Sequence, residues 1–216
     1  MREPIIKLKD ISFDYDSRLI LNALNLEIYE GEKIGLIGPN GSGKTTLLQI
    51  IIGLLKPHRG TVEIFEKIRV KEKDFTEIRH KIGFLFQNSD NQLFCPTVKE
   101  DIAFGPLNLG KTKQEAMKIV RETCKILGLE GFEDRITYKL SEGEKKLVAL
   151  ATVIAMNPLC FLLDEPSAGL NENTTEKILS FIKSTKKTFL IVSHNKEFLK
   201  EVADKIFLLK DGRIKY

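Results

Sequence analysis

The sequence predicts an α/β fold with a mainly parallel sheet, an N-terminal antiparallel β subdomain and an inserted α-helical subdomain. Short apolar runs that are typical of buried parallel strands alternate with helical periodicity at both ends of the chain. Between them, residues 88–157 have helical periodicity instead. We therefore expect a single domain over residues 1–216, in which residues 1–87 and 158–216 form the α/β core with its β subdomain and residues 88–157 form the helical subdomain.

The spacing of apolar residues predicts the individual elements. Alternating apolar positions predict the first two strands, and short continuous apolar runs predict the others. The predicted strands are, in chain order, IIKLKDISFDY, LNLEIY, KIGLIG, TVEIF, KIGFLF, LCFLLD, TFLIVS and KIFLLK. The predicted helices are Lys44–Leu54, KQEAMKIVRETCKILGL, GEKKLVALATVIAM, Thr174–Ser184 and Asn195–Ala203.

Composition restricts the class of protein. A chain of 216 residues with 42% apolar and 30% charged residues is typical of a folded globular protein, and its net charge of +4 is only mildly basic. The scattered cysteines Cys95, Cys124 and Cys160 have no metal-ligand spacing and indicate a reducing compartment. No apolar run approaches the ~20 residues that span a bilayer, and the start MREPIIKLKD has no signal-peptide run. We expect a cytosolic chain whose membrane role is peripheral.

The stretch GPNGSGKTT fits the pattern G-x-x-x-x-G-K-[ST] and stands between a predicted strand and a predicted helix. Its glycines let the backbone wrap a phosphate chain with N–H groups pointing inward, and the helix N-terminus adds its dipole. Lys44 is expected to reach the β- and γ-phosphates, and the Thr45 hydroxyl to bind Mg²⁺. The predicted core is therefore that of a P-loop nucleoside triphosphatase. Its predicted nucleotide-binding residues are Gly38, Pro39, Asn40, Gly41, Ser42, Gly43, Lys44, Thr45 and Thr46.

Polar side chains follow other predicted strands, at the edge where open α/β sheets bind ligands. In CFLLDEP, Asp164 is placed to hold Mg²⁺ and Glu165 to orient or deprotonate the attacking water. His194 directly follows TFLIVS and is expected to contact the γ-phosphate. Gln87 follows KIGFLF, where its amide would bridge Mg²⁺ and the water. Tyr15 ends the first strand, where it would stack on a purine or serve only as a strand aromatic.

In this order, these motifs resemble the ATP-binding cassette ATPases of ABC transporters along essentially the whole chain. GPNGSGKTT is similar to the Walker A motif and CFLLDEP to Walker B with its catalytic glutamate. Gln87 is similar to the Q-loop glutamine, His194 to the switch histidine, and Tyr15 to the adenine-stacking aromatic. LSEGEKK, residues 140–146, occupies the place of the LSGGQ signature, which is specific to this family.

The resemblance implies ATP and Mg²⁺ as ligands and a head-to-tail dimer, in which Ser141, Gly143 and Glu144 of one subunit bind the ATP held by the other. Here Glu142 replaces a family glycine and Glu144 a family glutamine. Ser141 and Glu144 also fit a capping box, S-x-x-E, which is a local reason for both residues. Negative charge suits a helix N-terminus but opposes an incoming phosphate. We therefore expect Glu142 to point away from the nucleotide and Gly143 to make the close approach.

A narrower resemblance lies in QNSDNQLFCPTVKEDIAFGPLNLG, which is similar to the segment after the Q-loop in cobalt/nickel and energy-coupling-factor ATPases. It implies an importer for a metal ion or a vitamin, whose integral membrane subunit inserts a coupling helix into this surface. Leu93, Phe94 and Val98 are expected to line that groove, or else to belong to the core of the helical subdomain.

Dimer contacts are expected to differ from the family pattern at one position. SAGLN ends in Asn171, where the family usually has an Asp that contacts the other subunit. Relatives in the cobalt and energy-coupling group often carry a C-terminal extension that helps dimerisation. Because the sequence ends at Tyr216, we expect dimerisation to depend on ATP and on the membrane partner.

The sequence thus predicts an ATP-hydrolysing subunit on the cytoplasmic face of a membrane, which energises an importer through ATP-driven closure of a homo- or heterodimer, with no nucleic-acid partner. The alternative is a soluble ABC-type ATPase that acts on nucleic acid or in translation, but such proteins commonly carry a second cassette or coiled-coil heptads. A GTPase or small-molecule kinase is disfavoured because NKEF lacks the Asp of the guanine-reading motif. A regulatory module with a dead site is disfavoured by the intact Lys44, Asp164, Glu165 and His194.

Overall fold

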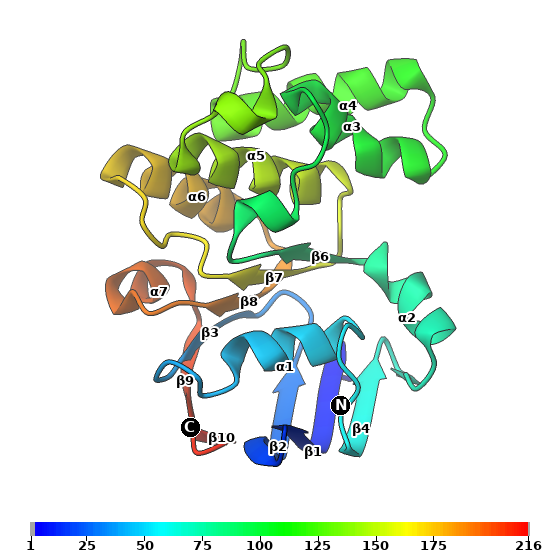
Figure 1. Ribbon diagram of the computed structural model, residues 1–216, viewed down its shortest axis with the longest axis vertical. Coiled ribbons are helices and arrows are strands. Elements are labelled where there is room, and N and C mark those ends of the chain that lie inside the picture. The colour runs from blue at the N-terminus through cyan, green and yellow to red at the C-terminus, as the bar shows by residue number, and fades with distance from the viewer. Residues whose placement is uncertain (1–2, 216) are drawn as a thin grey trace.

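The computed structural model describes residues 3–215, and Tyr216, where the sequence ends, lies outside them. Its strands form a six-stranded sheet in the order β10-β9-β3-β8-β7-β6 and a four-stranded sheet in the order β2-β1-β4-β5 (Figure 1). The strands are β1 (Ile6–Tyr15), β2 (Arg18–Ile28), β3 (Lys33–Ile37), β4 (Arg59–Ile64), β5 (Lys67–Ile68), β6 (Ile82–Leu85), β7 (Cys160–Asp164), β8 (Thr188–Val192), β9 (Lys205–Lys210) and β10 (Arg213–Lys215). The α-helices are α1 (Lys44–Ile51), α2 (Glu72–Arg79), α3 (Val98–Asn108), α4 (Lys113–Leu127), α5 (Glu142–Ala155), α6 (Glu172–Ser184) and α7 (Lys196–Val202).

The six-stranded sheet is parallel except at β10, which pairs antiparallel with β9. Its central strands are buried on both faces, which explains their continuous apolar sequences. In β7, for example, Phe161 and Leu163 contribute to a core shared with the helices above the sheet in Figure 1, whereas Cys160 and Leu162 contribute to a core around α1. Because successive side chains of a strand point to opposite faces, one short apolar strand joins two cores.

The four-stranded sheet is antiparallel and lies across α1 from the parallel sheet (Figure 1). Ile6, Leu8 and Ile11 of β1 are fully buried. They share one core with the α1 residues Leu47, Leu48, Ile50 and Ile51. Helix α1 therefore lies between two sheets. It ends at Ile51, three residues before the predicted Leu54, and Gly53 follows with a φ of 71°.

Helices α3, α4 and α5 pack together with α6 above the parallel sheet (Figure 1). Capping boxes begin α3 at Thr97, α4 at Thr112 and α5 at Ser141, and Gly128 ends α4 in the left-handed conformation. The predicted fold class, α/β with a mainly parallel sheet, an antiparallel N-terminal sheet and packed helices, is confirmed. Among residues 3–215, no helix is long and apolar enough to cross a membrane.

The sequence pattern did not predict four elements individually, namely α2, α3, β5 and β10. Helix α2 spans eight residues, of which only Phe75 and Ile78 are buried, so that its apolar periodicity is too short to be distinctive. Strand β5 has only two residues, both exposed. What positions the functional site is the parallel arrangement of β3, β6, β7 and β8, because the carboxyl ends of parallel strands lie at one edge of the sheet.

Candidate ATP-binding and hydrolysis site

The predicted phosphate loop, residues 38–43, connects the end of β3 to the start of α1. Gly38 is required there because a Cβ would lie 2.3 Å from the Leu209 carbonyl oxygen, and Gly43 adopts a φ of 100°. The Lys44 ammonium donates hydrogen bonds to the carbonyl oxygens of Gly38 and Pro39, at 2.9 and 3.0 Å. Burial lowers the pKa of Lys44, an effect that the nearby carboxylates Glu165 and Asp164 oppose. Lys44 thus stabilises the conformation of its own loop. The same ammonium donors can bind a phosphate.

Two polar groups beside this loop have unsatisfied hydrogen-bonding capacity. Asp164, the last residue of β7, accepts a hydrogen bond at Oδ2 from the Thr45 hydroxyl at 2.7 Å, whereas its buried Oδ1 has no hydrogen-bond partner. Burial raises the pKa of the Asp164 carboxyl, and the Thr45 hydrogen bond opposes that change. The buried Ser42 hydroxyl is also without a partner. Buried polar atoms without partners are rare in folded proteins and point to a ligand.

This arrangement fits a Mg²⁺ ion that is bound together with a phosphate. Such an ion typically takes one or two carboxylates from the protein, with substrate phosphates and water as its remaining ligands. Among residues 3–215, no group of three or more His, Cys, Asp or Glu side chains is arranged to hold a metal ion by itself. Thr45 and Asp164 are adjacent through their hydrogen bond, and the Gln87 side chain lies at the same cavity.

Glu165 follows β7 in a left-handed conformation, with a φ of 48° that is unusual for a residue other than glycine. Its backbone N–H donates to the Val192 carbonyl at 2.9 Å, which fixes it beside the end of β8. Its Oε2 accepts a hydrogen bond from the His194 backbone N–H at 3.2 Å, and its Oε1 lies 3.3 Å from His194 Nε2 without forming a hydrogen bond. A buried carboxylate with a free oxygen is thereby held at the mouth of the phosphate loop, as a general base requires.

These groups line one cavity of about 470 Å³. It brings together the predicted residues from the ends of four strands and most of those from the phosphate loop, but Gly38, Pro39 and Ser42 are not in its lining. Its lining consists of Tyr15, Arg18, Ile20, Asn40, Gly41, Gly43, Lys44, Thr45, Thr46, Gln87, Asp164, Glu165 and His194. The Tyr15 ring is 46% exposed and packs edge-on against Phe13 at 4.8 Å, so that it is available to stack on a base.

Of the signature residues, Glu142 lines a neighbouring cavity together with Thr45, Gln87 and Asp164, and the residues expected to bind the second ATP lie outside the cavity described above. None of Ser141, Gly143 and Glu144 lines the cavity that holds the phosphate loop. The predicted capping box is confirmed: Glu144 Oε2 accepts from the backbone N–H and hydroxyl of Ser141, both at 2.8 Å, and these hydrogen bonds lower the Glu144 pKa. The Glu142 side chain is 77% exposed and forms an ion pair with Lys145 at 3.3 Å.

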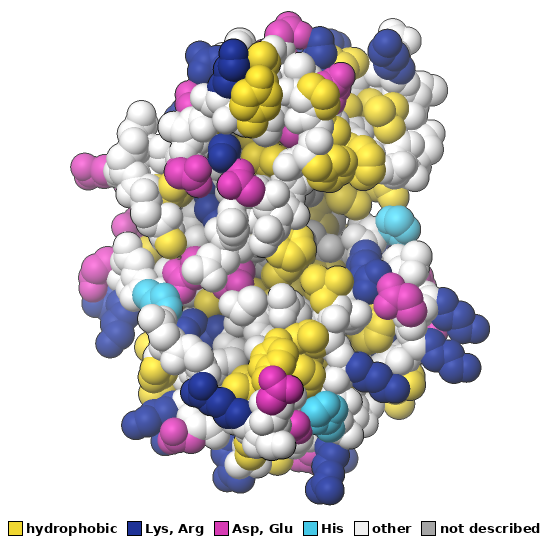
Figure 2. All heavy atoms as spheres, in the orientation of Figure 1, with side chains coloured by type: hydrophobic (Ala, Val, Ile, Leu, Met, Phe, Trp, Pro, Cys, Tyr) yellow, Lys and Arg dark blue, Asp and Glu magenta, His cyan; other side chains and the backbone are white. Residues whose placement is uncertain are grey.

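The predicted partner surface is only partly exposed. The Phe94 side chain is 66% exposed and packs edge-on against the half-exposed Phe104, with ring centroids 4.7 Å apart. Figure 2 shows hydrophobic side chains gathered over the region of α3. Leu93 is half-buried against the helical core. Of the two roles expected for Val98, the partner groove is contradicted and the core of the helical subdomain holds, because this first residue of α3 is fully buried in that core.

Asn171, which was expected at the dimer contact, has a local role in the subunit. Its side-chain oxygen accepts a hydrogen bond from the Thr174 backbone N–H at 2.9 Å and caps helix α6. An Asn is as good an N-cap as an Asp, so that the substitution is neutral for the helix itself. The side chain is exposed.

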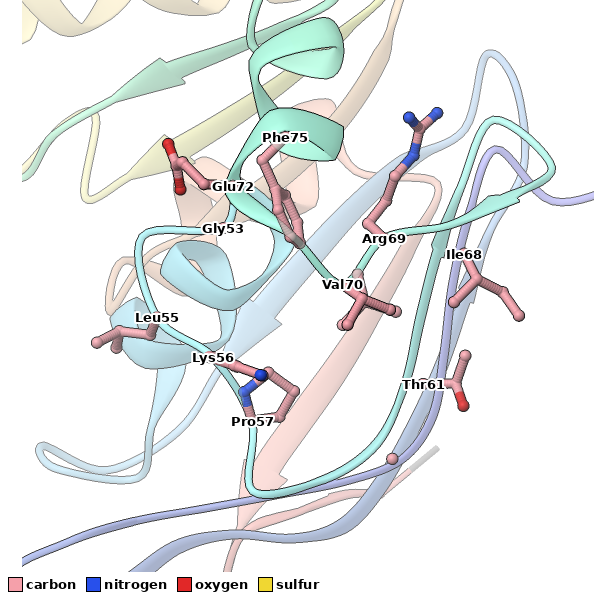
Figure 3. A pocket seen from close by; sticks show the side chains of 12 residues that line it. Gly53, Leu55, Lys56, Pro57, Thr61, Ile68, Arg69, Val70, Glu72 and Phe75 are labelled. Atoms are coloured by element: carbon pink, nitrogen blue, oxygen red, sulfur yellow. The ribbon is translucent and has the colours of Figure 1, made fainter.

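A second cavity of about 260 Å³ lies away from this chemistry, between the end of α1, α2 and the antiparallel sheet (Figure 3). Phe75, Val70 and Leu55 lie along it, and it shares no residue with the cavity at the phosphate loop. Its buried Arg69 directs its guanidinium to the Ile64 and Asp74 carbonyls and to Glu77, so the charge is already paired within the fold.

Sequence reasoning missed two residues near the site. Arg18 lines the cavity, with its guanidinium over Gly41 of the phosphate loop, yet nothing in the local pattern distinguishes it from another strand-end cation. Lys146 is buried, and its ammonium donates to the carbonyl oxygens of Phe86 and Gln87. A signal for Lys146 was present, because it falls on the buried face of α5 with Leu150 and Val153.

Comparison with known proteins agrees with this geometry. The family model described as "ABC transporter" matches residues 21–168. The energy-coupling factor transporter ATP-binding protein EcfA of Methanocaldococcus jannaschii is 43% identical over 215 residues, which cover 97% of this chain and 77% of that protein. A putative ABC transporter ATP-binding protein of Brucella suis is 45% identical over 212 residues, which cover 98% of this chain and 88% of the relative.

Solved structures give the same assignment. CbiO1 of Clostridium perfringens, described as part of the ABC transporter complex CbiONQ, has a TM-score of 0.88 at 33% identity, covering 100% of this chain and 88% of that one. A dimeric ATP-binding cassette in a post-hydrolysis state with ADP and Pi has a TM-score of 0.88 at 33% identity, covering 98% of this chain and 97% of the other. The chain therefore belongs to the ABC transporter family, as an ATP-hydrolysing ATPase of the energy-coupling-factor and cobalt type.

Proposed function

We propose that this chain is the ATPase subunit that energises a membrane importer for a metal ion such as cobalt or nickel, or for a vitamin, and that it acts through ATP-driven closure of a head-to-tail dimer. The proposal depends on one observation: the phosphate site of a single subunit lacks the signature residues. Lys44, Thr45, Asp164 and Glu165 converge on one cavity, whereas the signature residues at the start of α5 lie outside it. A second subunit would supply them to the open side of the phosphate loop.

The chemistry follows from the positions of the side chains. Lys44 and the N–H groups of the phosphate loop would bind the β- and γ-phosphates, which keeps the terminal phosphorus in line for attack. Glu165 would orient a water and take its proton as the water oxygen bonds to the γ-phosphorus and the bond to the ADP oxygen breaks. His194 would donate to the γ-phosphate. Thr45, Asp164 and Gln87 would hold Mg²⁺, which when bound neutralises phosphate charge.

The exposed aromatic pair supports docking of a membrane subunit beside the Q-loop. Phe94 and Phe104 border a cavity of about 290 Å³ that extends to Phe84, Phe86 and Met156. Gln92 also lines this cavity, and its side-chain amide donates a hydrogen bond to the Ala149 carbonyl in α5. Exposed contiguous apolar surface of this kind marks interaction sites, and aromatic residues are enriched among the energetically dominant contacts of interfaces. We propose a peripheral location on the cytoplasmic side of the membrane on this basis.

Serine replacement of both Phe94 and Phe104 tests this function. The chain would be co-expressed with the integral membrane proteins encoded beside it, and uptake of labelled Co²⁺, Ni²⁺ and vitamins would be measured. We expect the double variant to lower uptake at least about ten-fold, because it removes the apolar anchors of the interface, while ATP hydrolysis by the isolated subunit changes by less than about two-fold. Ile126→Ser, at an exposed position on α4, is the control. Normal uptake by the double variant, or hydrolysis that responds to nucleic acid instead, would contradict the proposal.

Glu142→Gly tests whether the unusual acid of the signature weakens the ATPase. Because the Glu142 carboxylate is exposed and paired with Lys145, its charge is largely screened, and we expect the variant to change hydrolysis and ATP-dependent dimerisation by less than about two-fold at physiological salt. Glu142→Gln separates charge from backbone effects. A ten-fold increase in both variants would instead identify Glu142 as a brake on closure.

A further inference from the structure

Lys146 connects the signature helix to the Q-loop of its own subunit. The residue lies one turn into α5 and is only 5% exposed. Its ammonium donates hydrogen bonds to the Gln87 carbonyl at 2.5 Å and to the Phe86 carbonyl at 3.3 Å. These carbonyls belong to the segment in which Gln87 lines the phosphate cavity. A buried lysine is costly for a fold unless its charge is compensated, so this contact requires an explanation.

The charges around Lys146 come from the catalytic site. Burial lowers its pKa, and the carboxylates of Asp164, Glu142 and Glu165, in that order, act in the opposite direction. Asp164 and Glu165 are the acids that follow β7, whereas Glu142 belongs to the signature. Lys146 also lines one cavity together with Asp164, Glu142 and Gln87, so it lies between the acids of two motifs and the backbone of the Q-loop.

Further contacts bind the same segment to α5. Lys145 forms ion pairs with Asp90 at 2.8 Å and with Glu142 at 3.3 Å. Gln92 accepts from the Phe86 backbone N–H at 3.2 Å and donates to the Ala149 carbonyl at 3.0 Å. Residues 86–92 are thus attached to α5 on both sides of Gln87. Lys146 is the contact that reaches the backbone of Gln87 itself.

Helix α5 also begins with the residues that the proposed dimer presents to the ATP of the other subunit. Ser141 and Gly143 are one turn from Lys146 on a helix with an intact cap, so that a displacement at its N-terminus moves the lysine with it. We propose that Lys146 is a positioning residue that transmits engagement of the signature at one ATP to Gln87 at the subunit's own ATP. This inference rests on the proposed head-to-tail dimer. It implies that hydrolysis at the two ATP sites of the dimer is cooperative.

Lys146→Met tests the proposal, because methionine fills nearly the same volume without a donor or a charge. We expect ATP affinity within about two-fold of the original, kcat lowered at least about ten-fold, and the Hill coefficient for ATP hydrolysis lowered from above about 1.5 to about 1. Lys146→Arg keeps a donor and should retain most of the cooperativity. Lys118→Met, at an exposed position of α4, is the control. A purely structural role would lower thermal stability and leave the Hill coefficient unchanged, which would overturn the proposal.

A second measurement uses the native lysine, in case Lys146→Met does not fold. In Glu165→Gln protein with ATP, hydrogen exchange of amides 86–92 should slow only when the dimer forms. In the Glu165→Gln, Gly143→Asp double variant, which should bind ATP without using its signature, these amides should stay unprotected. Protection of 86–92 by ATP alone would refute transmission through α5. If the Glu165→Gln protein binds ATP but remains monomeric, the dimer of the proposed function fails as well; if it dimerises and Lys146→Met stays cooperative, only the role of Lys146 fails.

Discussion

Glu165→Gln is expected to lower ATP hydrolysis at least about a hundred-fold while leaving ATP affinity within about two-fold. The side-chain oxygen that accepts from the His194 backbone is retained, so the local structure should persist. What is lost is the carboxylate that takes the proton of the attacking water. Phosphate release at saturating ATP and Mg²⁺ measures the rate, and equilibrium binding of ATP measures the affinity.

The control for Glu165→Gln is Glu172→Gln, which makes the same change at an exposed acid in the first turn of α6. It should hydrolyse ATP at the original rate. Because hydrolysis no longer ends the closed state, the Glu165→Gln protein should also accumulate as an ATP-bound dimer. Steady-state turnover by this variant would show that another group accepts the proton.

Gly143→Asp is expected to reduce hydrolysis by a comparable factor for a different reason. Gly143 is the second residue of α5, where an added side chain has ordinary van der Waals space beside Thr174. An aspartate at this position is favourable for the isolated helix but places a negative charge where the partner's γ-phosphate would approach. ATP binding by the variant should therefore persist while dimerisation and hydrolysis are lost, by about a hundred-fold for hydrolysis.

Helix α4 provides the matched control, since it begins with the same kind of capping box. Gln114→Asp places the same residue at the same second position, after the Thr112 cap instead of the Ser141 cap. This variant should have the original hydrolysis rate and stability. If Gly143→Asp also retained hydrolysis, the start of α5 would not face a phosphate.

Most of the nucleotide site was predictable because its chemistry is encoded in short contiguous stretches. The phosphate loop needs glycines at fixed positions, and Gly38 and Gly43 are required by a 2.3 Å approach to a carbonyl and by a φ of 100°, respectively. Asp164 and Glu165 were identifiable because an apolar strand ends there. The capping box of Ser141 and Glu144 was likewise a local pattern, and it is present.

The residues that were not predicted depend on contacts between segments distant in sequence. For Val98 the sequence left two roles open, a partner groove or the core of the helical subdomain, and the packing of α3 places it in the core. Lys146 looked like one of two similar lysines, yet Lys145 reaches Asp90 at the surface while Lys146 reaches Gln87 in the interior. The helical periodicity of α5 indicates that Lys146 lies on the buried face, but its contact with Gln87 depends on how the helix packs against the Q-loop, which no local pattern encodes.

The central claim, that each ATP site is shared between two subunits, is tested most directly by mixing two inactive variants. Lys44→Met lacks the phosphate lysine and Gly143→Asp lacks a usable signature, so each variant alone should hydrolyse ATP at about one hundredth of the original rate or less. In the mixed dimer, one site combines an intact phosphate loop with an intact signature. Equal amounts should therefore recover at most about a quarter of the original rate, since about half of the dimers are mixed and each has one complete site. If the coupling proposed for Lys146 operates, the complete site works without its neighbour and the recovered rate falls towards about one fortieth of the original. A mixture no more active than its components, or a Gly143→Asp protein that is fully active alone, would contradict a shared site.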